Sequence, residues 1–160
     1  MQTKDELEYV GFWARVGASL IDTVLTVCIT LPLIVSIYGW AYFDPEDTDV
    51  VKGLPDFLIS YVLPAAVVVA FWIYKQATPG KMAIGSRIVD ARTGEPVSPT
   101  QSVVRYLGYF VSAIPLGIGI LWVAFDARKQ GWHDKMAGTV VVRPRHRQLS
   151  PVSFDKSPGA

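Results

Sequence analysis

Three long apolar runs, at residues 16–38, 57–74 and 106–125, constrain the fold of this chain more than any other feature. Each run has about 18–23 residues, which is the length of helix that crosses a hydrocarbon core of about 30 Å. Hydrophobic residues make up 51% of the chain and are bunched in these runs, unlike those of most soluble cores. We therefore expect an integral membrane α-helical protein with one domain over residues 1–147 and a disordered tail over 148–160.

The charges between the runs predict which side of the membrane each connection faces. Residues 41–56 carry five acidic residues and one lysine, whereas residues 75–105 carry five basic and two acidic residues. Because lysine and arginine accumulate in cytoplasmic loops, we expect the first connection to be external and the second to be cytoplasmic. The N-terminus is then cytoplasmic, and the first run is a retained helix rather than a cleaved signal peptide.

The third apolar segment, with its helix at about 102–126, permits two topologies. Residues 112–119 contain Pro115 and two glycines, so the segment can break into half-helices at about 102–113 and 116–126. We favour a re-entrant helical hairpin, which keeps the basic C-terminal segment cytoplasmic; a single kinked span is the alternative. The hairpin also lets the β-branched runs 86–90 and 139–143 pair into a small cytoplasmic β cap.

A charged residue inside the first apolar run is the strongest sign of a special site. Asp22 is its only ionisable group, and a carboxylate at that depth costs about 2.5–3.5 kcal/mol on insertion scales. Arg15 lies two helical turns earlier on the same face, so we expect Asp22 to pair with Arg15 or Arg105. The buried charge network that we predict comprises Arg15, Asp22, Arg105, Asp126 and Asp134.

These charges fall within an ordered series of short motifs. The series consists of Arg15, Asp22, Thr-Pro-Gly-Lys at 78–81, Gly-Ser-Arg-Ile-Val-Asp at 85–90, and Phe-Asp-x-x-x-Gln-Gly-x-His-Asp-x-x-Ala-Gly-Thr at 125–139. Over residues 9–143 it resembles the RDD family of bacterial membrane proteins, which is named for one arginine and two aspartates. Arg15 and Asp22 match the first two positions, and Asp134, or alternatively Asp126, matches the third. The resemblance implies a bacterial plasma (inner) membrane location and says little about activity, although cation/proton exchange is proposed for some members.

The sequence contains no pattern that is typical of an enzyme. No Ser-His-Asp, Cys-His or paired-carboxylate arrangement is present, so we expect no catalytic residues and no cofactor. Metal binding is not expected either, because His133 and His146 are the only histidines and lie thirteen residues apart. The net charge of +1 gives no reason to expect nucleic acid as a partner.

The expected partners are therefore those of a membrane protein. We expect the lipid bilayer, with anionic headgroups at the basic cytoplasmic rim, and either a homo-oligomer or a larger membrane-protein partner. The leading functional hypothesis is an accessory or interaction subunit of a membrane assembly, in which the charge network joins the first helix to the C-terminal segment. The alternative is an oligomeric cation/proton transporter that uses Asp22, since membrane-embedded carboxylates often mark ion pathways.

Overall fold

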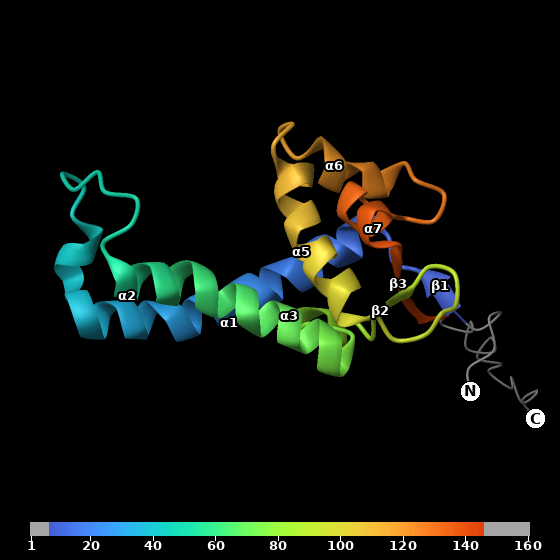
Figure 1. The fold of residues 1–160 in the computed structure, drawn as a ribbon, viewed down its shortest axis with the longest axis horizontal. Coiled ribbons are helices and arrows are strands. Elements are labelled where there is room, and N and C mark those ends of the chain that lie inside the picture. The colour runs from blue at the N-terminus through green and yellow to red at the C-terminus, as the bar shows by residue number, and fades with distance from the viewer. Residues whose placement is uncertain (1–6, 146–160) are drawn as a thin grey trace, which may run out of the picture.

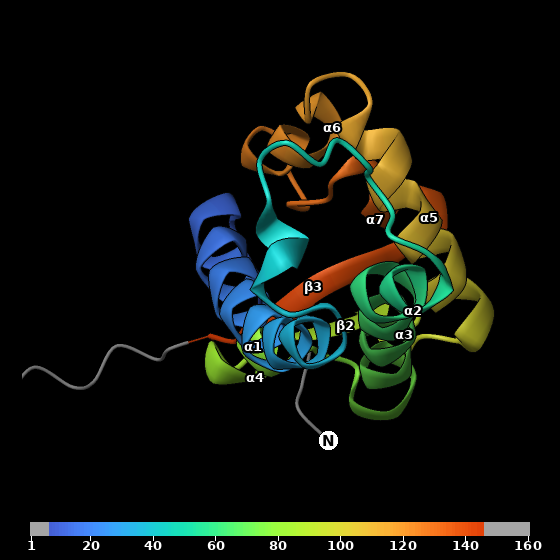
Figure 2. The same ribbon diagram turned by 90° about the vertical axis from the view of Figure 1, so that its left-hand side faces the viewer.

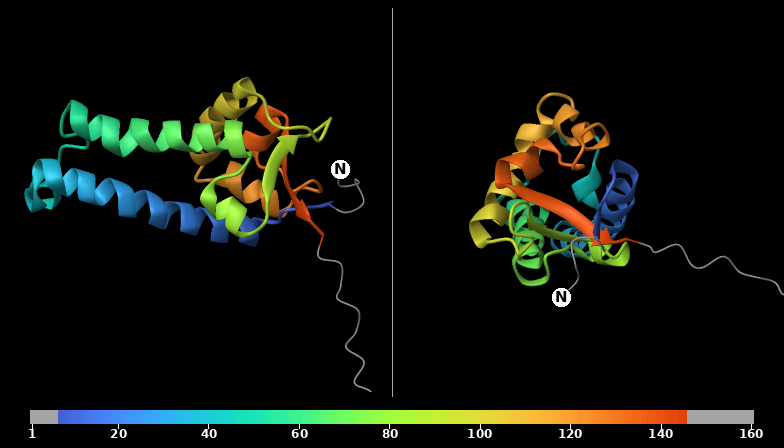
Figure 3. Two further views of the ribbon diagram at one scale, coloured as in Figure 1. Left: turned by 90° about the horizontal axis from the view of Figure 1, so that it is seen from below. Right: turned by 90° about the vertical axis from the view of Figure 1, so that its right-hand side faces the viewer.

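A long helical hairpin projects from a base that contains a small β-sheet (Figure 1). The computed structural model describes residues 7–145, so the tail predicted at 148–160 lies outside the described residues. The first arm is α1 (Phe12–Tyr38). The second arm runs without a break through α2 (Leu54–Phe57), the π-helical segment η3 (Leu58–Val62) and α3 (Leu63–Lys75). Figure 3 shows the two arms side by side along their length.

The two arms confirm the first two predicted membrane helices. Within the described residues, both arms are long and apolar enough to cross a membrane, and few of their residues are fully buried by the rest of the chain. Gly39, with φ of +67°, follows the last residue of α1, and the 3-10 turn η2 (Trp40–Phe43) begins the return loop. The helices begin at Phe12 and Leu54 rather than at 16 and 57, so Arg15 lies inside the first helix.

The third apolar segment forms two short helices with a sharp bend between them. They are α5 (Pro99–Ala113) and α6 (Ile118–Leu121), and the latter continues into the 3-10 turn η4 (Trp122–Ala124); the bend is 114°. Ser98 caps α5 by accepting a hydrogen bond from the backbone N–H of Gln101. The break that Pro115 predicts is therefore confirmed. Figure 2 shows this bent pair to one side of the two arms.

The predicted pairing of two β-branched runs is also confirmed. In the antiparallel sheet β1-β3-β2, strand β2 (Arg87–Asp90) pairs with β3 (Thr139–Pro144), so that Ile88 lies opposite Val141. The strand β1 (Leu7–Tyr9) pairs with the other edge of β3. Its three residues are too few to show a strand pattern, and the sequence did not predict it. The two ends of the described chain thus lie in neighbouring strands.

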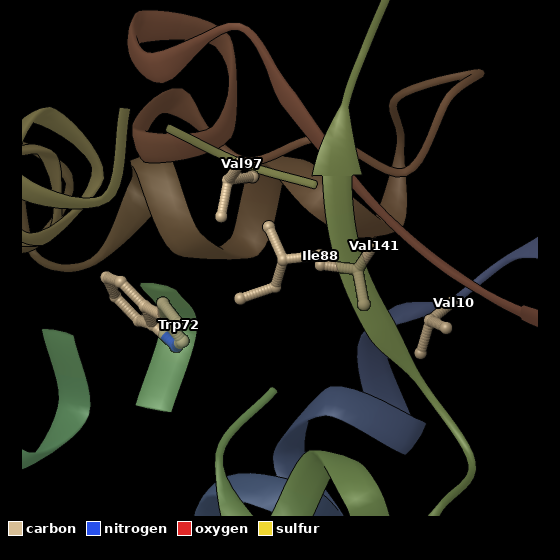
Figure 4. Packing of buried hydrophobic residues seen from close by; sticks show 5 residues of the cluster. All are labelled: Val10, Trp72, Ile88, Val97 and Val141. Carbon is tan, nitrogen blue, oxygen red and sulfur yellow. The ribbon is translucent and has the colours of Figure 1, made fainter. Parts of the chain in front are cut away.

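A buried cluster joins the sheet to the base of the hairpin. Val10, Trp72, Ile88, Val97 and Val141 form this core, as Figure 4 shows. They come from the entry to α1, the end of α3, two strands and the loop before α5. Two short helices complete the base: α4 (Pro79–Ala83) packs against α1, and α7 (Trp132–Ala137) packs against α5.

Candidate functional site

Asp134, in α7, lies between two arginines from distant parts of the chain. Its Oδ2 atom lies 2.6 Å from Nη1 of Arg15, and its Oδ1 atom lies 2.7 Å from Nη2 of Arg105. The carboxylate is 0% exposed, and the side chains of Arg105 and Arg15 are 1% and 11% exposed. Burial opposes ionisation of Asp134, but the two guanidinium charges outweigh it and lower the pKa of Asp134 to about 2. We call these three residues the Arg–Asp–Arg clamp.

The arginines of the clamp also bind the surrounding backbone and β3. Arg15 donates from Nη2 to the Lys129 carbonyl (2.5 Å) and from Nε to the Val10 carbonyl (3.1 Å). Arg105 donates from Nη1 to the hydroxyl of Thr139, the first residue of β3 (3.1 Å). The clamp therefore connects α5 to α7 through the ion pair of Arg105 with Asp134, and it connects α1 to α7 and α5 to the sheet through charge-assisted hydrogen bonds.

A glycine allows α7 to come close enough to α5 for the clamp to form. A Cβ atom added to Gly108 would lie 2.8 Å from Cα of His133, a separation that real Cβ contacts do not show. The backbone N–H of His133 donates to the hydroxyl of Ser112 on the next turn of α5 (3.1 Å). This close contact places Asp134, the next residue, within reach of Arg105.

Asp22 does not pair with an arginine, contrary to our expectation. Its Oδ2 atom accepts a hydrogen bond from the hydroxyl of Thr78 (2.5 Å), and its Oδ1 atom accepts one from the backbone N–H of Gly80 (2.7 Å). The chain turns back directly after α3, and α4 packs against α1, which places these two donors at the carboxylate. Asp22, Thr78 and Gly80 thus form a latch between α1 and α4, separate from the clamp.

Asp126 is also separate from the clamp. Its Oδ1 atom lies 2.6 Å from Nζ of Lys135, and its Oδ2 atom accepts the backbone N–H groups of Arg128 and Gln130, both at 3.1 Å. These contacts close the loop that precedes α7. Of the two candidates for the second family aspartate, Asp134 is the one that contacts both arginines. The structure thus brings together Arg15, Arg105 and Asp134 from the predicted network and places Asp22 and Asp126 elsewhere.

A second fully buried carboxylate, Asp56, lies at the far end of the hairpin, and the sequence did not predict it. It is 0% exposed and accepts hydrogen bonds from the hydroxyls of Tyr42 (2.8 Å) and Ser60 (2.6 Å) and from the backbone N–H of Lys52 (2.8 Å). By sequence, Asp56 is one of five acidic residues in a polar loop. Only the folding of the return loop over the helix end distinguishes it from its exposed neighbours.

The described residues do not assemble a metal centre. Among residues 7–145, no group of three or more histidine, cysteine, aspartate or glutamate side chains is placed to hold a metal ion. The carboxylates of the clamp and of the latch are instead bound by protein donors. The site thus joins helices through buried charged groups.

Two apolar arms, a bent helix pair and a buried charge clamp at one end define a small membrane protein with two helices that are long and apolar enough to span the membrane. The chain belongs to the RDD family, whose model matches residues 9–138. It is 28% identical over 140 residues to a proline-rich antigen homolog of Mycobacterium tuberculosis, covering 85% of this chain and 58% of that protein. An uncharacterised membrane protein of Bacillus subtilis is 28% identical over 142 residues, covering 86% and 82%.

An uncharacterised protein of Rickettsia prowazekii is 36% identical over 87 residues, which is 54% of this chain and 48% of that protein. The chain therefore spans about half the length of the Rickettsia and Mycobacterium relatives. No solved structure matches it.

The buried histidine next to the clamp predicts a pH-dependent stability. Burial lowers the pKa of His133 to about 3, with the nearby Asp134 opposing and Arg105 assisting this shift. Between its ordinary pKa of about 6.5 and this value, the unfolded chain binds one more proton than the folded chain. Stability should therefore fall as the pH is lowered from 6.5 to 5, by up to about 1.4 kcal/mol per pH unit.

Thermal unfolding in detergent at pH 7.5, 6.5, 5.8 and 5 measures this slope. His133→Phe keeps a ring against Tyr109, whose centroid lies 3.9 Å from that of His133, and removes the titrating group. The variant should show a flatter dependence than the parent protein. If the stability of His133→Phe depends on pH as steeply as that of the parent protein, groups other than His133 cause the pH dependence.

Proposed function

We propose that this chain is a non-enzymatic accessory subunit of a membrane assembly in the bacterial plasma membrane, formed with further copies of itself or with a larger membrane protein. Both ends of its described part face the cytoplasm in this proposal. The basic connection at 75–105 supports that orientation. The pairing of β1 with β3 supports it as well, because it requires both strands to lie on one side of the membrane.

The bent pair α5–α6 enters the membrane from the cytoplasmic side and returns to it in this proposal. Its tip is apolar and uncovered by the rest of the chain: Ile114 is 81% exposed and Leu116 is 93% exposed. Large adjacent apolar side chains at a turn favour contact with hydrocarbon over contact with water. The strand β3, which follows the pair, lies beside β1 in the sheet, so a pair that returns to the side it entered from agrees with this arrangement.

The observation that carries the accessory role is the latch at Asp22. Both oxygens of this carboxylate accept short hydrogen bonds, one from Thr78 and one from Gly80, which belong to the segment after the second arm. These two hydrogen bonds hold α4 against α1. A carboxylate that joins two helices in this way has a structural role, which supports an accessory subunit.

One observation favours the alternative of an oligomeric cation/proton transporter. Asp22 lines a cavity of about 390 Å³ together with the hydroxyl residues Ser19, Thr23 and Thr26 of the same helix. Polar side chains beside an ionisable residue at this depth are typical of ion pathways. The two functions therefore make different predictions for the same residue.

Two single variants, Asp22→Asn and Thr78→Val, distinguish the accessory subunit from the transporter. Asp22→Asn keeps the shape of the side chain and removes its charge, whereas Thr78→Val removes the hydroxyl donor and leaves the carboxylate charged. For an accessory subunit, we expect both variants to reduce the amount of folded protein and its assembled mass in mild detergent. Light scattering coupled to size-exclusion chromatography measures that mass, and Asp126→Asn is the matched control outside the latch.

The transporter makes the opposite prediction. Asp22→Asn should then assemble normally and lose proton-coupled cation flux in proteoliposomes, while Thr78→Val keeps its flux. A parent protein that purifies as a monomer without a stoichiometric companion would contradict both functions.

A further inference from the structure

A cavity beside the latch, called here the Lys81 cavity, is lined by nitrogen-bearing side chains for which the described residues provide no acceptor. It has a volume of about 390 Å³ and lies between α1, α3, α4 and α5. Its lining includes Lys81 and Trp72, which are 6% and 2% exposed. The indole Nε1 of Trp72 has no hydrogen-bond partner in the described chain. Buried donors without acceptors are costly, so this cavity is suited to a ligand that supplies oxygen acceptors.

The latch fixes the position of Lys81. The preceding residue, Gly80, is bound to Asp22, and the Lys81 carbonyl accepts hydrogen bonds from both the N–H (2.9 Å) and the hydroxyl of Ser86 (3.0 Å). Among residues 7–145, no carboxylate or other acceptor pairs with its ammonium group. Burial lowers the pKa of Lys81, and an anion in the cavity would favour its charged form.

The balance of buried charges around the cavity also favours an anion. Three cations, Lys81, Arg105 and Arg15, are accompanied by two carboxylates, those of Asp22 and Asp134. The first carboxylate is bound in the latch and the second in the clamp. The five groups therefore carry one excess positive charge, and Lys81 is the one of the three cations for which the described residues provide no ion pair, although Asp22 lines the same cavity.

A second, apolar cavity adjoins the Lys81 cavity. It has a volume of about 480 Å³, lies between α1 and the bent pair α5–α6, and shares the lining residues Ser19, Thr23 and Tyr109 with the Lys81 cavity. The rest of its wall is mainly aliphatic and includes Leu20 and Ile120. A cavity that contains the Lys81 ammonium group and the Trp72 N–H thus continues into an aliphatic one, which matches the headgroup and the acyl chain of a phospholipid.

We propose that these two cavities form a binding site for a membrane lipid with an anionic phosphate headgroup. The lipid phosphate accepts hydrogen bonds from Lys81 Nζ and Trp72 Nε1, and an acyl chain lies in the apolar cavity against α1 and α6. This site goes beyond the accessory role and does not depend on it.

Lipid binding can be measured by native mass spectrometry of the full chain in detergent, titrated with phosphatidylglycerol or phosphatidylcholine. We expect the protein to bind phosphatidylglycerol in preference to phosphatidylcholine, with one lipid per chain. Lys81→Gln should weaken phosphatidylglycerol binding about tenfold, because it removes a charge-assisted hydrogen bond. Lys75→Gln is the matched control: it makes the same change at an exposed lysine six residues away and should leave binding unchanged.

A second variant and a competition experiment test the two parts of the site separately. Trp72→Phe keeps the aromatic packing, removes only the N–H donor and should weaken binding by a smaller factor than Lys81→Gln. Inorganic phosphate, added alone, should compete only weakly because it cannot occupy the apolar cavity. Equal binding of the two lipids, equal losses in Lys75→Gln and Lys81→Gln, or full competition by inorganic phosphate would each overturn the lipid site.

Discussion

Asp134→Asn is expected to destabilise the protein by about 3–5 kcal/mol, because it leaves the buried Arg105 guanidinium without a negative partner. The substitution keeps the size of the side chain, so the loss reports charge rather than packing. Arg105 is 1% exposed and cannot turn to water, whereas Arg15 is 11% exposed and retains its hydrogen bonds to backbone carbonyls. The free energy of unfolding in detergent, or the thermal midpoint, measures the effect.

Asp126→Asn provides the matched control for this prediction. The ion pair of Asp126 with Lys135 is partly exposed, the lysine side chain being 44% exposed, so its loss should cost about 1 kcal/mol or less. In the double variant Asp134→Asn with Arg105→Met, the second change should cost less than it does alone, since the two residues interact directly. Equal losses in the two Asp→Asn variants, or strict additivity in the double variant, would show that the clamp does not hold α7 to α5.

Gly80→Ala should also have a large effect, about 3 kcal/mol or more, because it adds an atom where α4 touches α1. The new Cβ would overlap the carbonyl oxygen of Ala18 and lie 2.9 Å from Cγ of Asp22. Backbone atoms cannot move aside as a flexible side chain can, so α4 has to withdraw from α1. That withdrawal breaks the hydrogen bond from Gly80 to Asp22 and displaces Lys81 from its cavity.

The control for Gly80→Ala is Gly17→Ala, on the helix that α4 contacts. No atom lies within 4 Å of the Cβ position at Gly17, so this variant should be neutral or slightly more stable through the higher helix propensity of alanine. Unfolding of both variants in the same detergent makes the comparison. If Gly80→Ala is as stable as Gly17→Ala, close packing of α4 on α1 is not required for the latch.

Local patterns in the sequence were sufficient to predict most of the helices and one strand pair. The length of the apolar runs predicted the two arms, and Pro115 predicted the break in the third segment. The β-branched residues predicted the pairing of β2 with β3. The short elements β1, α4 and α7 were not predicted. Each has three to six residues and is stabilised by contacts with distant segments rather than by its own sequence pattern.

The charged site was predicted only in part, for a related reason. The sequence identified Arg15, Arg105 and Asp134 as members of one network, and the structure brings them together. It paired Asp22 with an arginine on grounds of charge, yet the carboxylate binds a hydroxyl and a backbone N–H instead. Opposite charges can be recognised in a sequence. Almost every residue has a backbone N–H, however, so only the folded structure shows which of them binds a given carboxylate.

The sequence by itself thus determined that this chain enters a membrane. A run of about 20 successive apolar residues matches the thickness of the hydrocarbon core, and this depends on composition and length alone. It also determined that a buried carboxylate in the first helix needs a partner, because an unpaired charge in hydrocarbon is costly. Only the tertiary structure decided which partner each carboxylate has. The latch joins residues 56 and 58 positions apart, and the clamp joins Arg15 to Asp134 across 119 positions. The packing of α4 on α1 and of α7 on α5 brings these residues together.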